Sequence, residues 1–307
     1  MNTRTAVADG ALVLEHRDED AELLERWLPR PHPEPQEARV VVALEALEPA
    51  ERTWLAERVM GPPTLSLATV RAWVDAGHRR VALAGRAGLG VLNLAAGRGS
   101  LDPAGALDDG YTMLTLAAGL LLSAAGRVLV HAGAVRRPDG GVLLLAGDTH
   151  SGKSTTALTV ARAPGWAWLS DDQVVLAPQP DGAVEVFGWV RQPHLDAGYD
   201  RGQSTGRRRD ADPDFVASLP WVPSGRLVGS VLPAVRERAP SKARPAAAAE
   251  ALEALIRQGA WILAEGVSAR SALRIVRAAA GEPARHLDLG LDCFARPERL
   301  ALLLSPS

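Results

Sequence analysis

The feature that most constrains this chain is a short glycine-rich segment that follows an apolar run. The segment Gly147-Asp-Thr-His-Ser-Gly-Lys-Ser154 satisfies the pattern G-x-x-x-x-G-K-[ST]. The residues before it, Val142–Ala146, are all apolar and predict a buried strand, and the residues after it, to about Arg162, predict a helix. A strand, a glycine-rich turn and a helix in this order favour an α/β fold.

This pattern has a specific physical use. Gly147 and Gly152 permit a backbone path that turns successive N–H groups toward one point, where they can bind phosphate oxygens. The N-terminus of the following helix adds partial positive charge. Lys153 would reach the outer phosphates of a nucleotide, and the Ser154 hydroxyl would bind Mg²⁺. The residues expected to bind ATP with Mg²⁺ are Gly147, Asp148, Thr149, His150, Ser151, Gly152, Lys153, Ser154 and Thr155.

Composition singles out the lysine of this segment. Of the 34 lysine and arginine residues in the 307-residue chain, only Lys153 and Lys242 are lysine. A chain with this bias keeps lysine where a compact ammonium serves better than a guanidinium. Lys242 lies in a Pro- and Ala-rich stretch and has no role that we can assign.

A pair of aspartates follows the next predicted strand. Asp171 and Asp172 come directly after the segment Trp166-Ala-Trp-Leu-Ser170. An aspartate at a strand end beside a phosphate-binding loop is the usual outer partner of the nucleotide's Mg²⁺. Because side chains alternate along a strand, one aspartate could hold the metal while the other takes a proton from an attacking hydroxyl. We select Asp172 as the metal ligand with Ser154, although the two roles are interchangeable at this stage, and a solvated acidic turn is the alternative.

Two more side chains are candidates for the same site. His131 ends the apolar strand Val128–Val130, which we expect to pair with the strand before the glycine-rich segment and so bring His131 to the transferred phosphate. A hydrogen-bonded core histidine is the alternative. Arg191 could contact the acceptor or stabilise charge in the transition state. It begins a polar segment, 191–226, that is expected to form a long loop or a lid and also contains Arg207–Arg209.

These elements together resemble the HPr kinase/phosphorylase family, and most closely its shorter, divergent relatives. The resemblance covers about residues 129–176, with His131-Ala-Gly, the glycine-rich segment and Leu169-Ser-Asp-Asp-Gln-Val-Val-Leu176, and extends loosely to 287–292. It implies an α/β P-loop kinase core of the HPr kinase and phosphoenolpyruvate carboxykinase type. It further implies that ATP with Mg²⁺ is the donor and a serine hydroxyl the acceptor.

The resemblance also assigns roles. Lys153 and Ser154 would bind phosphates and metal, Asp171 and Asp172 would share the base and metal roles, and His131 would lie near the transferred phosphate. One departure is that Val184-Glu-Val-Phe-Gly188 lacks the arginine of the signature found in bifunctional members. This argues against the reverse phosphorylase activity and against HPr as the substrate.

The expected acceptor is therefore a serine in another peptide or small protein. A kinase for a small molecule, such as a free amino acid, is one alternative. A nucleotide-dependent regulatory protein that transfers nothing is the other.

The rest of the chain predicts two regions. An N-terminal α/β accessory domain is expected over residues 1–105 and the catalytic domain, with a helical C-terminus, over 106–307. The predicted accessory strands are Val40–Leu44 and Val81–Ala84. The predicted helices are Pro49–Met60, 109–125, 246–263 and 268–280.

Charge and cysteine content exclude several classes. A net charge of −2 gives no basic field that would attract nucleic acid or an anionic membrane. The longest apolar run, Met113–Ala125, is too short to span a bilayer. Cys293 is the single cysteine, which excludes an internal disulfide and suits a reducing compartment. We therefore expect a cytoplasmic protein with no nucleic-acid or membrane partner, and we leave open whether it forms a homo-oligomer.

Overall fold

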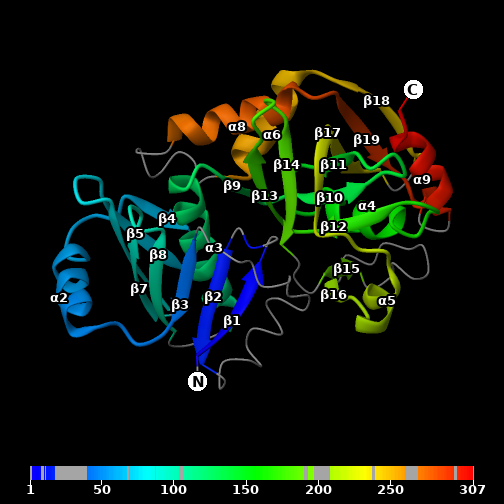
Figure 1. The fold of residues 1–307 in the computed structure, drawn as a ribbon. Coiled ribbons are helices and arrows are strands. Elements are labelled where there is room, and N and C mark those ends of the chain that lie inside the picture. Colours follow the sequence, from blue (N-terminus) through cyan, green and yellow to red (C-terminus); the bar gives the residue numbers. More distant parts are fainter. Residues whose placement is uncertain are drawn as a thin grey trace. The chain divides into compact units, whose positions relative to one another are not determined.

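The computed structural model has a mixed α/β fold with two compact units (Figure 1). The first unit is Met1–Leu129 with Ala260–Arg274, and the second is Val130–Gly259 with Ile275–Ser307. The division falls after Leu129 and not at 105/106, because helix α3 (Leu107–Ala124) packs on the sheet of the first unit. The structure describes residues 2–7, 10, 12–17, 40–67, 69–86, 88–103, 107–189, 193–196, 208–236, 239–259, 269–293 and 296–306.

The first unit is built on an eight-stranded sheet in the order β1-β2-β3-β8-β7-β6-β5-β4. Strand β3 lies parallel to both β2 and β8, and the other neighbours are antiparallel. Helices α2 (Pro49–Arg58) and α3 pack on this sheet, and no described helix is long and apolar enough to cross a bilayer. The strands are β1 Asn2–Val7, β2 Leu12–Arg17, β3 Val41–Leu44, β4 Leu65–Leu67, β5 Val70–Asp75, β6 Arg80–Gly85, β7 Gly88–Asn93 and β8 Arg98–Pro103.

The predicted strands and the helix at Pro49 are confirmed, but this unit contains more strand than the sequence predicted. Residues 85–99, a second stretch rich in glycine in which no element was predicted, contain β7 and the start of β8. A Cβ at Gly90 would lie 2.5 Å from Leu101 Cδ2, and a Cβ at Gly99 would lie 2.5 Å from Leu92 Cδ2. Glycine is therefore needed here so that leucines can pack across the sheet.

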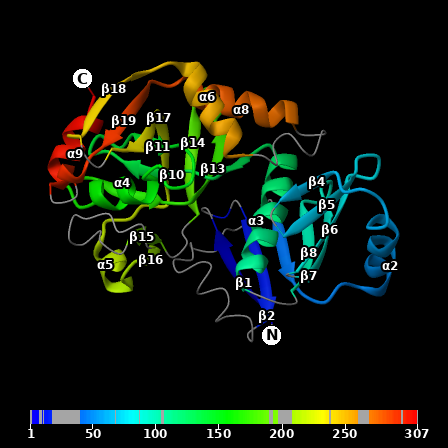
Figure 2. The same cartoon turned by 180° about the vertical axis from the view of Figure 1, so that it is seen from behind.

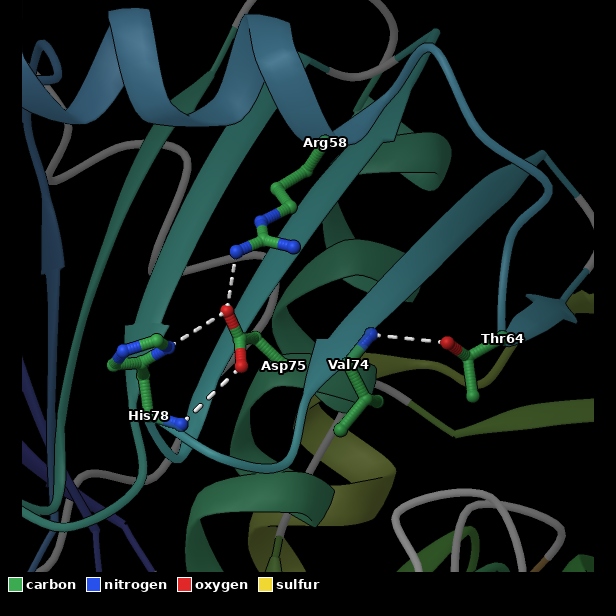
Figure 3. Close-up of polar contacts among 5 residues, drawn as sticks. All are labelled: Arg58, Thr64, Val74, Asp75 and His78. Atoms are coloured by element: carbon green, nitrogen blue, oxygen red, sulfur yellow. Dashed lines mark hydrogen bonds and ion pairs between the residues drawn. The ribbon is translucent and has the colours of Figure 1, made fainter.

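One carboxylate fixes the turn between β5 and β6 (Figure 3). Asp75 accepts a hydrogen bond from the backbone N–H of His78 at 3.2 Å, contacts its Nδ1 at 3.1 Å, and accepts another from Arg58 Nη2 at 2.6 Å. The hydrogen bond from the His78 side chain is the main cause that lowers the pKa of Asp75. The backbone N–H of Val74 donates to Thr64 Oγ1 at 3.0 Å. The contact between Arg58 and Asp75 joins the end of α2 to the end of β5.

The second unit is built on a nine-stranded sheet. Its main path runs β12-β10-β11-β17-β14-β13-β9, and β19 pairs with β17 and with β18. The strands are β9 Val128–Val130, β10 Gly133–Arg136, β11 Val142–Leu145, β12 Ala167–Ser170, β13 Gln173–Pro178, β14 Val184–Trp189, β17 Ser224–Val235, β18 Lys242–Ala246 and β19 Ala284–Leu289. The helices are α4 Lys153–Val160, α5 Pro213–Ser218, α6 Ala248–Arg257, α8 Ala269–Gly281, which spans the division between the units, and α9 Pro297–Leu304.

A tight hairpin precedes the glycine-rich segment. Strands β10 and β11 pair antiparallel, and the Arg137 N–H donates to Gly141 O at 2.8 Å. Asp139 closes the turn by accepting a hydrogen bond from the Gly141 N–H at 3.0 Å, and Gly140 takes a φ of +89°. Asp-Gly supplies the conformation that such a turn requires.

The directions of the strands place the ends of several of them at one edge of this sheet. Strand β10 is antiparallel to both of its neighbours, β11 and β12, so β11 and β12 run in the same direction. Strands β17 and β19 also run parallel to β11. The carboxyl ends of these four strands therefore lie at the same edge as the amino end of β10.

Helices α4 and α9 cover one face of this sheet (Figures 1 and 2). Leu143 and Leu145 of β11, together with Leu287 and Leu289 of β19, join these helices in one buried apolar cluster. Cys293 belongs to the same cluster, and burial raises the pKa of its thiol. Cys293 is therefore part of the buried core of this unit.

Two predictions about this unit need correction. The C-terminal part is not purely helical, because β18 and β19 add two strands to the sheet, and α6 ends at Arg257. The segment 191–226 is not one long loop in its described part. It contains the antiparallel pair β15 (His194–Asp196) and β16 (Arg208–Asp210), helix α5, and the start of β17.

Candidate functional site

The glycine-rich segment forms a tight loop between β11 and α4. Gly147 has a φ of +157° and Gly152 a φ of +102°, and a Cβ at Gly152 would lie 3.0 Å from Leu289 Cδ2. His150 is exposed and takes a φ of +68°, a conformation that costs a residue with a side chain about 1–3 kcal/mol. The Ser151 N–H donates to Asp148 O at 3.1 Å and closes the turn. Such a strained loop indicates a functional role for its shape.

The lysine of this loop lies inside it. Lys153 is the first residue of α4 and only 6% exposed. Its Nζ donates to Gly147 O at 2.8 Å and to Asp148 O at 3.1 Å, so the side chain turns back across the loop. A cation is thereby held beside the backbone N–H groups at the start of a helix, which is a favourable place for an anion.

Two hydroxyl groups of the loop and helix are buried without a partner. Ser151 Oγ and Thr156 Oγ1 make no hydrogen bond to any of the described residues. A buried hydroxyl left in this state costs about 1–3 kcal/mol. A phosphate oxygen is the kind of acceptor that would satisfy Ser151. Ser154 and Thr155 are partly exposed in the first turn of α4, where the metal-binding hydroxyl was predicted.

The aspartate pair lies at the same sheet edge as this loop. Ser170 of β12 pairs with Ala134 of β10, and Leu145 of β11 pairs with Gly133. Only β10 separates β12 from β11, so the two strand ends are about 10 Å apart at the usual spacing between strands. The sequence-predicted aspartates and the loop are therefore brought to one edge by the sheet topology.

The two aspartates differ in their surroundings. Asp171 is 3% exposed, whereas the Asp172 side chain is 25% exposed. Asp172 Oδ1 lies 3.2 Å from Nδ1 of His131, whose side chain is 27% exposed. Asp172 and His131 thus form an accessible acid–imidazole pair, and Asp171 lies beneath the surface.

A buried serine holds the aspartate turn in place. Ser170 Oγ donates to Trp189 O at 2.8 Å and accepts from the N–H of Asp172 at 3.4 Å and of Gln173 at 3.2 Å. Gly133 on β10 lets this turn come close, because a Cβ there would lie 3.3 Å from Ser170 O. The turn is therefore tied to the neighbouring strands by Ser170.

Gln258, directly after α6, joins two parts of the site. Its carbonyl accepts from the His131 N–H at 3.0 Å, and its Nε2 donates to Asp148 Oδ1 at 3.3 Å. Sequence reasoning missed this residue. Nothing in the local pattern around Gln258 marks a contact with an aspartate 110 positions away.

The path by which His131 reaches the site also differs from the prediction. Its strand, β9, does not pair with β11 and lies at the far end of the main sheet path, beside β13. His131 reaches the site because it precedes β10, which does pair with β11. Arg191 and Arg207 lie outside the described residues, and Arg209 is exposed on β16.

Comparison with known proteins gives little beyond this geometry. No family model matches the chain, and no curated protein matches its sequence. Among solved structures, the chain is similar to the Hpr(Ser) kinase/phosphatase from Coxiella burnetii, at 16% identity with a TM-score of 0.26. The match covers 38% of this chain and 70% of that chain.

The described residues contain no group of three or more His, Cys, Asp or Glu side chains that could hold a metal ion. Mg²⁺ bound with a nucleotide takes one or two carboxylates from the protein and its other ligands from phosphates and water. The candidate ligands are therefore Ser154 at the start of α4 and the aspartates after β12.

Proposed function

We propose that the chain binds ATP with Mg²⁺ at the loop 147–155 and transfers the γ-phosphoryl group to a hydroxyl. The observation that carries this proposal is the buried Lys153 amine, held by two carbonyls inside a glycine-dependent loop at the start of a helix. This combination supplies a fixed cation, converging N–H groups and a helix N-terminus, which together suit a chain of phosphates.

The side chains around the loop have distinct roles in this proposal. Lys153 binds the outer phosphates, and Ser154 gives its hydroxyl to Mg²⁺, which neutralises charge that develops on the phosphates. Asp172 is the carboxylate that substrate can reach, so it takes the proton from the attacking hydroxyl. His131 orients Asp172 through its Nδ1, and Asp171 serves the metal. This exchanges the metal and base roles that were first assigned to the two aspartates.

For the acceptor we propose a serine hydroxyl in a peptide or small protein. The support is the resemblance of residues 129–176 to the HPr kinase/phosphorylase family. For the location we propose a reducing compartment such as the cytoplasm, because a single cysteine allows no internal disulfide.

An acceptor screen tests this proposal. The chain is incubated with ATP and Mg²⁺ and with serine peptides, free serine or other small hydroxyl compounds, and the products are measured by mass spectrometry. We expect phosphorylated peptide, and we expect Lys153→Ala to lower the transfer rate by at least ~10². Lys242→Ala is the matched control, because Lys242 is the other lysine and its side chain is 66% exposed.

Each alternative has its own result in this screen. Transfer to free serine with the peptides untouched would establish a small-molecule kinase on the same loop. Steady release of inorganic phosphate, with no transfer to any acceptor, would rule out a kinase. ATP binding without turnover would instead identify a nucleotide-dependent regulatory protein.

A further inference from the structure

A cavity of about 400 Å³ lies beside the phosphate loop, on the side away from the aspartate pair. One wall is the loop itself and the other is the end of β17, which extends beyond the end of β11. Leu232, Pro233, Ala254 and His286 contribute to its lining. Cavities of this size, mostly apolar with a few polar groups, are typical of small-molecule sites.

Alternation along β19 explains why a histidine lines this cavity. Leu287 and Leu289 point into the core formed with α4 and α9, so His286 projects from the opposite face of the sheet. There its Nε2 lies 3.0 Å from Glu250 Oε1 of α6. His286 was assigned no role from the sequence, since β19 itself was not predicted.

Glu250 determines which nitrogen of the His286 ring carries the proton. Its carboxylate accepts a hydrogen bond from the Ala247 N–H at 2.8 Å, and this contact, followed by the one with His286, lowers the pKa of Glu250. An ionised carboxylate only accepts, so Nε2 of His286 must be the donor. In the neutral imidazole Nδ1 is then an acceptor, and it makes no hydrogen bond with the described residues.

The order of the strands places the cavity and the reacting end on opposite sides of the loop. The aspartate pair follows β12, two strands from β11 in one direction, whereas the cavity lies over β17 and β19 in the other. A nucleotide whose γ-phosphate faces Asp172 must extend the other way along the loop. Its base and ribose then arrive at the cavity.

We propose that this cavity binds the nucleoside part of the nucleotide, with Leu232, Pro233 and Ala254 packing against the base. His286 accepts a hydrogen bond, through Nδ1, from an amino group of the base or a hydroxyl of the ribose. This inference rests on the proposed function, because it requires the phosphates to lie in the loop.

The test compares two ligands that share phosphates but not the nucleoside. Binding of ATP and of inorganic tripolyphosphate, each with Mg²⁺, is measured by isothermal titration calorimetry. Ala254→Phe fills the cavity, and we expect it to raise the Kd for ATP about tenfold or more while leaving the Kd for tripolyphosphate within about twofold. The matched control is Ala249→Phe, which places the same side chain at an exposed position of α6 outside the cavity.

A second variant guards against misfolding of the first. His286→Ala removes the acceptor without adding bulk, and it should weaken ATP binding about threefold to tenfold and leave tripolyphosphate unaffected. Circular dichroism and thermal melting establish that each variant is folded.

Three results would overturn the inference in distinguishable ways. If the wild type binds neither ligand, the loop does not bind phosphate and the proposed function fails as well. If Ala254→Phe and His286→Ala change the Kd values for ATP and tripolyphosphate equally, or change neither, the nucleoside lies elsewhere and the assignment of the loop to phosphate binding survives. If they leave ATP binding intact but raise the KM for the acceptor, the cavity belongs to the acceptor.

Discussion

Replacing Gly152 by alanine tests directly whether the shape of the loop matters. Gly152 has a φ of +102°, and its position immediately before α4 sets the direction of the first helical N–H groups. A Cβ there would lie 3.0 Å from Leu289 Cδ2 and 3.3 Å from Val235 Cγ2. Alanine at this position would therefore strain the backbone and crowd the Leu289 side chain.

The magnitude follows from these two terms. A residue with a side chain in this backbone region costs about 1–3 kcal/mol. Moving the buried Leu289 off its preferred rotamer costs about 0.5–1.5 kcal/mol more. We therefore expect Gly152→Ala to lower the free energy of unfolding by about 1.5–4.5 kcal/mol.

The effect on ligand binding is more specific. If the backbone relaxes to relieve the strain, at least one N–H group turns away from the phosphates. A hydrogen bond to a charged group is worth about 1.5–3 kcal/mol, so the Kd for ATP should rise at least about tenfold.

Gly182→Ala is the matched control. Gly182 has a φ of +84° in the turn between β13 and β14, and nothing lies within 4 Å of a Cβ built there. The free energy of unfolding of this variant should fall only by the cost of backbone strain, and its Kd for ATP should stay within about twofold of the wild-type value. Urea unfolding and calorimetry measure both quantities. The reasoning is refuted if the two variants lose equal stability and Gly152→Ala still binds ATP as tightly as the wild type.

Three further predictions concern the acid–imidazole pair and the C-terminal end of the sheet. Asp172→Asn should lower the transfer rate by at least ~10² while the Kd for ATP changes less than about threefold, as single-turnover assays will show. Ser241→Ala should lower the free energy of unfolding by about 1–3 kcal/mol in urea titrations, because Ser241 Oγ donates to Asp292 Oδ1 at 2.6 Å and accepts from the Gly290 N–H at 2.8 Å. Burial raises the pKa of Asp292, but the hydrogen bonds from Ser241 and the charge of Arg299 outweigh it and hold that pKa below 3.8. This contribution to stability is present above the pKa of Asp292 in the unfolded chain and is lost as the pH falls through the lower pKa in the folded protein. The free energy of unfolding, measured from pH 6 to 2, should therefore depend less on pH in Asp292→Asn than in the wild type.

The local signals in the sequence were sufficient for the loop. Gly147, Gly152 and Lys153 stand in a pattern whose geometry depends on residues next to one another, and the Asp-Gly turn before β11 is equally local. The local context also distinguishes the two lysines, since Lys153, in the glycine-rich pattern, is buried in the loop, whereas Lys242, in a Pro- and Ala-rich stretch, is exposed. The aspartates follow a predicted strand, and the sheet places that strand two positions from β11.

The remaining parts depend on contacts between distant segments. The sequence could not show that β9 ends at the far side of the sheet, because strand order is set by packing and not by the strand's own residues. Strand β19 does carry a local signal, because polar His286 and Asp288 alternate with Leu287 and Leu289, but no strand was predicted there, and Pro245 argues against a strand at β18. Pro245 is tolerated because β18 pairs only with β19 and lies at the sheet edge. The cavity beside the loop depends on β17 and β19 lying side by side and so was not predicted.

The most direct measurement of the central claim is a titration of the wild type, Lys153→Ala and Lys242→Ala with ATP and Mg²⁺ in a calorimeter. We expect the wild type and Lys242→Ala to bind with the same Kd, and Lys153→Ala to bind at least about tenfold more weakly. Equal ATP affinity for the two lysine variants, or no binding by the wild type, would contradict the assignment of the loop.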